Sequence, residues 1–245
     1  MVAIVTGATG GIGKAICAVL AGDGYDLILV GRNKKTLSAE VTRLRRLYPK
    51  QLFYWAIVHM EQPREIHHFF QRKDLPFAQL SILVNNAGIS VGDDIFSLTE
   101  KDWDESFAVN VKAPFLFMQH TVHLMKDNRT HGSIINISSL TGLIGARKPN
   151  YASSKAGLIG LAQSVARSVG EFGIRVNTIA PGAVDTDLIA DWDKKKRQSV
   201  IDQTLVKRIA APEEIAEIVS FLASNKASYI IGAVINATGG SYLGI

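Results

Sequence analysis

The sequence predicts an α/β fold with a doubly wound parallel sheet of about seven strands, built within a single domain. Three observations predict it. Short apolar runs alternate with longer helical patterns along all 245 residues, several of these runs are continuously apolar, and the first leads directly into a glycine-rich segment. Continuous apolar runs are typical of strands that are covered on both faces. Strand–helix alternation builds parallel sheets through right-handed crossovers, with helices on both sides.

Each expected element follows from its local pattern. Strands are expected at the short apolar segments 2–5, 26–30, 52–58, 82–84, 133–137, 175–179 and 230–235. Helical periodicity places helices near 12–22, 34–47, 63–72, 99–125, 151–171 and 212–223. Thr99 and Asp102 form the ends of a capping box, and Pro212 precedes two first-turn glutamates. Gly173 is expected to end its helix in the left-handed conformation.

Composition excludes several classes of protein. The chain is 47% hydrophobic and 20% charged, which excludes disorder, collagen and coiled coil. The single cysteine, Cys17, excludes a disulfide scaffold, and no apolar run reaches the ~18–20 residues of a membrane span. The N-terminus shows no charged-then-apolar leader, so a cytoplasmic protein is expected. The whole of 1–245 is expected to be one domain, and the charged, poorly periodic segment 185–211 is expected to be a lid within it.

The charge pattern favours an anionic small ligand. The net charge is +5, which is only mildly basic. The basic residues are scattered and lack an aromatic platform, which argues against a nucleic-acid partner. The six histidines form no convincing metal site, because no acid or cysteine accompanies His120 and His123 on their shared helix face.

A glycine loop joins the first expected strand to the first expected helix. Its spacing is Gly7-x3-Gly11-x-Gly13, which is neither G-x-G-x-x-G nor a P-loop. Glycines at this place allow a tight turn and close backbone approach to a pyrophosphate at a helix N-terminus. The second strand then ends at Arg32, where NAD-binding folds carry an acid. A guanidinium can bind a phosphate with two hydrogen bonds, so NADP(H) is the expected cofactor.

A second group of residues carries acid–base chemistry. Tyr151 and Lys155 are four residues apart, so they project from one face of a helix. An ammonium beside a phenol is expected to lower the pKa of the phenol toward the working range. Ser138 and Ser139 end the strand twelve or thirteen residues earlier, and either one can face the site.

Together these motifs resemble the short-chain dehydrogenase/reductase family over nearly the whole chain. The resemblance rests on the glycine loop, Asn85-Asn86-Ala87-Gly88, Asn110, Ser139, Tyr151/Lys155 and Pro181-Gly182-Ala183-Val184-Asp185-Thr186. It implies a Rossmann domain in which 185–211 covers the substrate. It implies four catalytic residues, which are Ser139, Tyr151, Lys155 and Asn110. It implies cofactor contacts from Gly7, Thr9, Gly10, Gly11, Ile12, Gly13, Arg32, Asn33, Met60, Asn86, Gly88, Tyr151, Lys155, Val184 and Thr186.

Within the family pattern, individual roles can be assigned. The resemblance implies that Tyr151 is the general acid, Ser139 orients the carbonyl oxygen, and Lys155 binds the nicotinamide ribose. Pro114 has no N–H to bond the carbonyl of Asn110, so that carbonyl is expected to be free at a helix kink. The resemblance implies that this carbonyl holds a water near Lys155. Where the family has an adenine-binding aspartate, this chain has His59.

The closest subfamily resemblance is to the 3-oxoacyl-[acyl-carrier-protein] reductases. It implies reduction of a 3-oxoacyl thioester, a homotetramer, and an acyl carrier protein as a possible partner. Arg129 lies near one carrier-docking position, but Phe172 replaces a basic residue at the other. Two alternatives stay open: the same chemistry on another ketone or secondary alcohol, such as a sugar, steroid or xenobiotic, and an NADP(H)-sensing protein without turnover.

Overall fold

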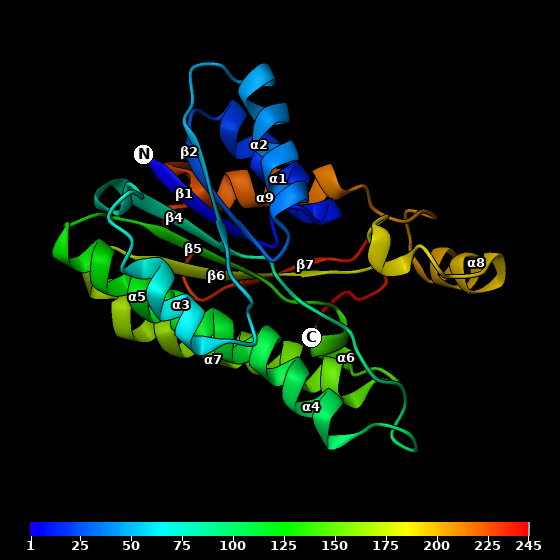
Figure 1. Cartoon of the computed structure of the whole chain (residues 1–245). Helices are drawn as coiled ribbons and strands as arrows, with labels where there is room; N and C mark the ends of the chain where they lie inside the picture. Colours follow the sequence, from blue (N-terminus) through cyan, green and yellow to red (C-terminus); the bar gives the residue numbers. More distant parts are fainter. Residues whose placement is uncertain (245) are drawn as a thin grey trace.

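The computed structural model describes residues 1–244. The fold is built on one seven-stranded sheet (Figure 1). Its strand order is β3-β2-β1-β4-β5-β6-β7, and every neighbouring pair is parallel. The strands are β1 (Val2–Thr6), β2 (Asp26–Gly31), β3 (Phe53–Ile57), β4 (Leu80–Asn85), β5 (Ser133–Ile137), β6 (Arg175–Pro181) and β7 (Val234–Ala237). The predicted doubly wound α/β fold is confirmed.

Helices cover both faces of the sheet. Figure 1 shows α1, α2 and α9 on one face, α3, α5 and α7 on the other, and α8 projecting beyond the sheet. The helices are α1 (Gly11–Gly22), α2 (Lys34–Leu47), α3 (Pro63–Phe70), α4 (Glu100–Phe107), α5 (Ala113–Asp127), α6 (Thr141–Ile144), α7 (Pro149–Val169), α8 (Lys194–Gln203) and α9 (Pro212–Ala223). None of the helices within 1–244 has the length and apolarity that a membrane crossing requires.

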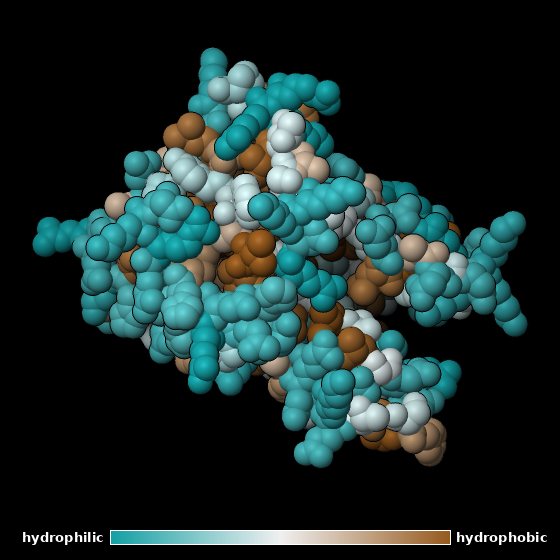
Figure 2. Space-filling view, in the orientation of Figure 1, coloured by the Kyte–Doolittle hydropathy of each residue, from teal (hydrophilic) through white to brown (hydrophobic). Residues whose placement is uncertain are grey.

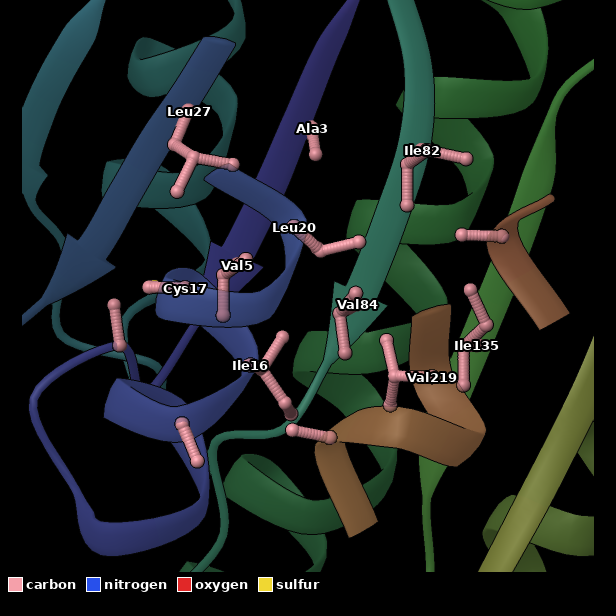
Figure 3. Packing of buried hydrophobic residues seen from close by; sticks show 14 of the residues in the cluster. Ala3, Val5, Ile16, Cys17, Leu20, Leu27, Ile82, Val84, Ile135 and Val219 are labelled. Atoms are coloured by element: carbon pink, nitrogen blue, oxygen red, sulfur yellow. The ribbon is translucent and has the colours of Figure 1, made fainter. Parts of the chain in front are cut away.

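Successive strand residues supply two separate cores. Side chains alternate between the faces of a strand, so Ala3 and Val5 join one cluster while Val2 and Ile4 join the other. Figure 3 shows the first cluster, where Ile16 and Leu20 of α1 and Val219 of α9 meet the sheet. Because both faces are covered, the strands are continuously apolar, which is the pattern the sequence displays.

The strand order reverses direction between β1 and β4, and this is where a doubly wound sheet opens a crevice. The two strand ends are tied together there. The Thr6 hydroxyl oxygen accepts the backbone N–H groups of Asn86 and Ala87, each at 3.0 Å. The Asn86 amide donates to the carbonyls of Thr6 and Gly7 at 3.0 and 3.1 Å. These bonds fix the glycine loop against the loop after β4.

The predicted helix 99–125 is wrong as a single element. The Thr99–Asp102 capping box is present, but α4 ends at Phe107 and a π-helical turn spans Ala108–Lys112 before α5. The N–H of Ala113 bonds to the Ala108 carbonyl, five residues earlier. Pro114 lies just beyond, and its missing N–H prevents a regular α-helical bond at this point.

Other boundaries also differ. The last strand begins at Val234 rather than 230, because Gly232 adopts a positive φ of 72° and its N–H bonds to the Val176 carbonyl. Helix α7 begins at Pro149, two residues before the predicted start, and ends at Val169. A 3-10 turn follows it, and Gly173 closes that turn with φ 72°, in the left-handed conformation that we predicted. The four-residue helix α6 was not predicted, because so short a helix has no periodicity.

Candidate active site

Two connected cavities lie at the carboxyl ends of the strands. The first, of about 370 Å³, extends from the glycine loop to Arg32, and the second, of about 350 Å³, contains Ser139, Tyr151 and Lys155. Both cavities are lined by Ile12, Asn86, Gly88, Ile89, Thr186 and Leu188, so one continues into the other. In the space-filling view this face is hollowed near its centre, with apolar surface on the walls (Figure 2).

The glycine loop forms the floor of the first cavity. Gly7 has a positive φ of 62°, which allows the sharp turn after β1. A Cβ on Gly11 would lie 2.6 Å from Cγ2 of Thr186, and one on Gly13 would collide with the Gly7 carbonyl oxygen. The backbone is therefore packed as tightly as glycine permits. This leaves the N-terminus of α1, whose N-cap residue Gly10 has no side-chain cap, open to an anionic ligand.

We expect Gly13→Ala to be one of the most damaging single substitutions in the loop. The added methyl group collides with a backbone carbonyl rather than with a side chain, so β1 and α1 must separate. Overpacking of this kind costs about 1–3 kcal/mol of the free energy of unfolding, which urea denaturation would measure. Gly10→Ala is the matched control, because its nearest atom would be at an ordinary 3.6 Å. Equal stability of the two variants would contradict this prediction.

Several predicted cofactor residues line the first cavity together. They are Gly7, Thr9, Gly10, Gly11, Ile12, Gly13, Arg32, Met60, Asn86, Gly88 and Thr186. Asn33, which was also predicted to contact the cofactor, is not among the residues that line this cavity. Its side chain caps α2 and accepts the N–H of Thr36 at 3.2 Å. His59 is turned aside as well, with its ring 3.0 Å from Glu65, so Val58 and Met60 form the wall.

The second cavity brings the predicted acid–base residues together. Tyr151 and Lys155 lie in the first two turns of α7, and Lys155 Nζ donates to the Ile137 carbonyl at 2.9 Å. Ser138 Oγ donates to the Lys155 carbonyl at 2.8 Å, so this serine braces the helix backbone. Burial raises the pKa of the Tyr151 phenol, and Ser139, which lies beside the phenol, partly opposes that rise. Of the two serines, Ser139 is therefore the one placed to act with Tyr151.

The pKa of Tyr151 shifts in the direction opposite to the one that the sequence predicts. Burial raises the pKa of Tyr151, and among the described groups around it only the Ser139 hydroxyl opposes that change. Lys155 Nζ lies 5.9 Å from the centre of the phenol ring and bonds to Ile137 instead. Burial lowers the pKa of Lys155 to about 8. Lys155 is not among the groups that shift the pKa of Tyr151, so the lowering expected from it is not seen, and desolvation of the phenol sets the direction.

Asn110 supports the site from behind. It is fully buried, and its side chain accepts the N–H of Ile89 at 2.9 Å and donates to Ser154 Oγ at 3.0 Å. Ser154 Oγ donates in turn to the Tyr151 carbonyl at 2.9 Å. Asn110 thus joins the loop after β4 to the helix that carries Tyr151. Pro114, which has no N–H, stands at the position of the α-helical donor to the Asn110 carbonyl, and this stretch is a π-helical turn.

Sequence reasoning missed Asn150, which is fully buried next to Tyr151. Its amide nitrogen donates to Ser106 Oγ at 2.8 Å and to the Val91 carbonyl at 3.1 Å. These bonds attach the start of α7 to α4 and to the loop after β4. Its position beside the tyrosine was visible in the sequence, but nothing there indicated that the side chain is buried.

The segment 185–211 forms one wall of the second cavity. Its contributions to the lining are Thr186, Leu188, Ile189, Trp192, Val200, Gln203 and Thr204, four of which are apolar. Val184, just before it, also lines this cavity, and it pairs with Ala210 at the far end of the segment. Leu140 and Ile144 also line this cavity. The reacting groups therefore face a largely apolar chamber.

Comparisons with known proteins agree with this geometry. The profile of the family described as "Enoyl-(Acyl carrier protein) reductase" matches residues 7–241. The chain is 34% identical to the 3-oxoacyl-[acyl-carrier-protein] reductase FabG of Thermotoga maritima, covering 98% of this chain and 96% of that protein. It is 33% identical to the human (3R)-3-hydroxyacyl-CoA dehydrogenase, covering 98% of this chain and 95% of that protein. The crystal structure of YwfH, an NADPH-dependent reductase involved in bacilysin biosynthesis, superposes with a TM-score of 0.93 at 27% identity, covering 100% and 99%.

Proposed function

The chain belongs to the short-chain dehydrogenase/reductase family, and from this premise we propose that it is an NADPH-dependent reductase of 3-oxoacyl thioesters. One observation carries the proposal. Ser139, Tyr151 and Lys155 line one largely apolar chamber, which continues into a cleft lined by the glycine loop and Arg32. A reductase needs a proton donor beside a hydride donor, and this arrangement supplies both places.

The first cavity fits NADPH. The crowded glycines let the backbone approach a pyrophosphate, and Arg32 stands where the adenosine ribose phosphate would lie. Val58 and Met60 offer an apolar wall to the adenine. Where the first cavity continues into the second, Asn86 and Thr186 would hold the nicotinamide and its ribose together with Val184 and Lys155 of the second cavity. When bound, NADPH supplies the hydride that reduces the carbonyl carbon.

The residues of the second cavity would complete the reaction. Tyr151 donates its phenolic proton to the carbonyl oxygen, and the raised pKa from burial keeps it protonated until that moment. Ser139 donates a hydrogen bond to the same oxygen as negative charge develops. The Lys155 ammonium stabilises the phenolate left behind. Asn110 holds the helix in place, and its carbonyl would accept a water that returns a proton toward Lys155.

We expect Arg32→Ala to reduce the preference for NADPH over NADH. A guanidinium–phosphate contact is a charge-assisted bond of about 1.5–3 kcal/mol, so the Kd for NADPH should rise about 10- to 100-fold. The Kd for NADH, which lacks that phosphate, should stay nearly constant. Fluorescence titration with both nucleotides measures this directly. Arg46→Ala is the control, because Arg46 is an exposed arginine of α2 that lines neither cavity. An equal loss for both nucleotides would contradict the assigned role.

The chamber also supports the substrate class. Its walls come from Leu140, Ile144, Leu188, Ile189 and Trp192. An acyl chain can be buried against such side chains without leaving polar groups unpaired. A second reductase function, on another small ketone or secondary alcohol, is favoured by the likeness to YwfH, which has a different biosynthetic role. A sensor without turnover is the third candidate, and the assembled Ser139, Tyr151 and Lys155 argue against it.

The test is NADPH oxidation with acetoacetyl-carrier protein and acetoacetyl-coenzyme A side by side, with NADH as control cofactor. Rapid turnover of the carrier-bound thioester supports a role in fatty-acid synthesis and a carrier partner. Docking would then tolerate Phe172, whose ring lies 4.4 Å from Lys126 Nζ. Turnover of the coenzyme A thioester alone makes that ester the substrate. If neither thioester is reduced although NADPH binds, the thioester proposal is refuted.

We further propose a cytoplasmic homotetramer. Trp103 of α4 and Phe115 of α5 are 39% and 40% exposed, and near β7 Tyr229 and Ile231 are 100% and 47% exposed. Large apolar side chains gathered at two places suit two kinds of subunit contact. Analytical ultracentrifugation would measure the mass, and a monomer at micromolar concentration would refute the tetramer.

A further inference from the structure

Thr141 directs two hydrogen-bond donors at one atom of the active site. It is the first residue of α6, two positions after Ser139. Its backbone N–H lies 3.2 Å from Ser139 Oγ, and its own hydroxyl lies 3.0 Å from the same oxygen. A serine hydroxyl has one proton to donate and two lone pairs that accept. Both lone pairs of Ser139 are therefore engaged by Thr141.

This arrangement leaves Ser139 one way to interact with other groups. With both lone pairs engaged, its hydroxyl proton is free to be donated. Ser139 and Tyr151 both line the second cavity, so the proton can be donated to the phenol or to a group bound in that cavity. Hydrogen bonds in a chain polarise one another, so a serine that accepts two bonds is a stronger donor in the third.

The surrounding backbone holds Thr141 in this position. The Leu140 N–H donates to the Pro181 carbonyl at 2.7 Å, and the Gly145 N–H to the Thr141 carbonyl at 2.9 Å. A Cβ on Gly142 would lie 2.8 Å from the carbonyl carbon of Lys155, so α6 is pressed against α7. The donors therefore cannot drift from Ser139 without moving the helix that carries Tyr151.

We propose that Thr141 is a positioning residue that holds the Ser139 hydroxyl as a dedicated donor, toward the Tyr151 phenol in the free protein or toward the reacting oxygen when a substrate is bound. The inference rests on the proposed reductase function and adds a fourth side chain to its hydrogen-bond relay. The relay runs from the Thr141 hydroxyl to Ser139 Oγ, and from the Ser139 hydroxyl to the phenol or the carbonyl oxygen. Nothing is transferred through Thr141, because its role is to orient and polarise.

The test compares Thr141→Val, which keeps shape and backbone N–H but lacks the hydroxyl, with Thr141→Ser, which keeps the hydroxyl. Without the second donor, the Ser139 hydroxyl is free to turn its proton away from the phenol, and it stabilises the phenolate less. The high-pH limb of kcat for carbonyl reduction should then move upward by about half a pH unit, and kcat should fall about fivefold. The KM for NADPH should not change, and Thr141→Ser should behave as the parent enzyme.

A second measurement separates this inference from the proposed function. The ultraviolet difference absorbance of tyrosinate follows ionisation of the phenol in the free protein, with Tyr151→Phe subtracted as the blank. Thr141→Val should move that titration upward as well, whether or not a carbonyl substrate is known. The proposal would be overturned if Thr141→Val left both the tyrosinate titration and the high-pH limb of kcat unchanged. So would a change confined to the KM for the carbonyl, or a Thr141→Ser variant that matches Thr141→Val.

Discussion

Replacing Tyr151 with phenylalanine is expected to lower kcat for carbonyl reduction by about 10³-fold, because the carbonyl oxygen then has no acid beside it. The ring itself remains, so the packing of α7 is preserved. Ser139 stays in place, since it is held by Thr141 and not by the phenol. NADPH should bind with nearly unchanged Kd, because Lys155 and the glycine loop are untouched. Single-turnover kinetics with saturating NADPH measure the loss in the chemical step.

Tyr54→Phe is the matched control for this variant. Tyr54 lies in β3, away from both cavities, so the loss of its hydroxyl should leave kcat unchanged. An active Tyr151→Phe enzyme would remove the phenol from its role as acid and leave Ser139 or water to supply the proton. A variant that also loses NADPH would indicate misfolding instead, which thermal unfolding would reveal.

Replacing Lys155 with methionine is expected to abolish turnover and, at the same time, to stabilise the free protein. Burial holds the pKa of this ammonium near 8 instead of the ordinary 10.5. A difference of one in pKa corresponds to about 1.4 kcal/mol, so burial of the charge costs about 3 kcal/mol at neutral pH. Loss of the bond to the Ile137 carbonyl offsets about 1 kcal/mol of the gain. The net increase in the free energy of unfolding is about 2 kcal/mol.

The size of this stabilisation depends on pH. Between the folded pKa of about 8 and the unfolded value, the unfolded chain holds the extra proton, so the stability of the parent protein rises with pH. The advantage of Lys155→Met should therefore be full below pH 8 and shrink toward pH 10. Urea unfolding at pH 7 and near pH 10 measures both points. Lys226→Met, an exposed lysine, is the control, and a Lys155→Met protein less stable than the parent at pH 7 would contradict the argument.

Much of this site could be predicted because it is encoded locally. The spacing of Gly7, Gly11 and Gly13 has one structural use, since a methyl group at Gly11 or Gly13 would strike a neighbouring segment. The four-residue interval between Tyr151 and Lys155 places both on one helix face wherever that helix lies. Asn33 shows the limit of such reasoning. Its place beside Arg32 predicts a cofactor contact, but the sequence does not show that its side chain also caps α2 by accepting the N–H of Thr36.

The pKa shifts of Tyr151 and Lys155 could be derived only from the tertiary structure. The sequence places an ammonium near a phenol but not the depth at which either is buried, and burial decides the direction of the pKa change for both. Which of Ser138 and Ser139 faces the Tyr151 phenol was likewise decided only by the tertiary structure. Both follow β5, and only the packing of α6 against α7 turns one toward the Lys155 backbone and the other toward Tyr151.

By itself the sequence determined the order of the seven strands, the glycine loop and the identity of the proposed reacting groups, because each depends on residue type and on spacing within one element. The tertiary structure alone decided how far apart those groups lie, how deeply they are buried, and which polar atoms hold them. Ser138, Asn110 and Asn150 illustrate this. Each bonds to a residue on another element, and such a contact exists only once the sheet has brought the two segments together.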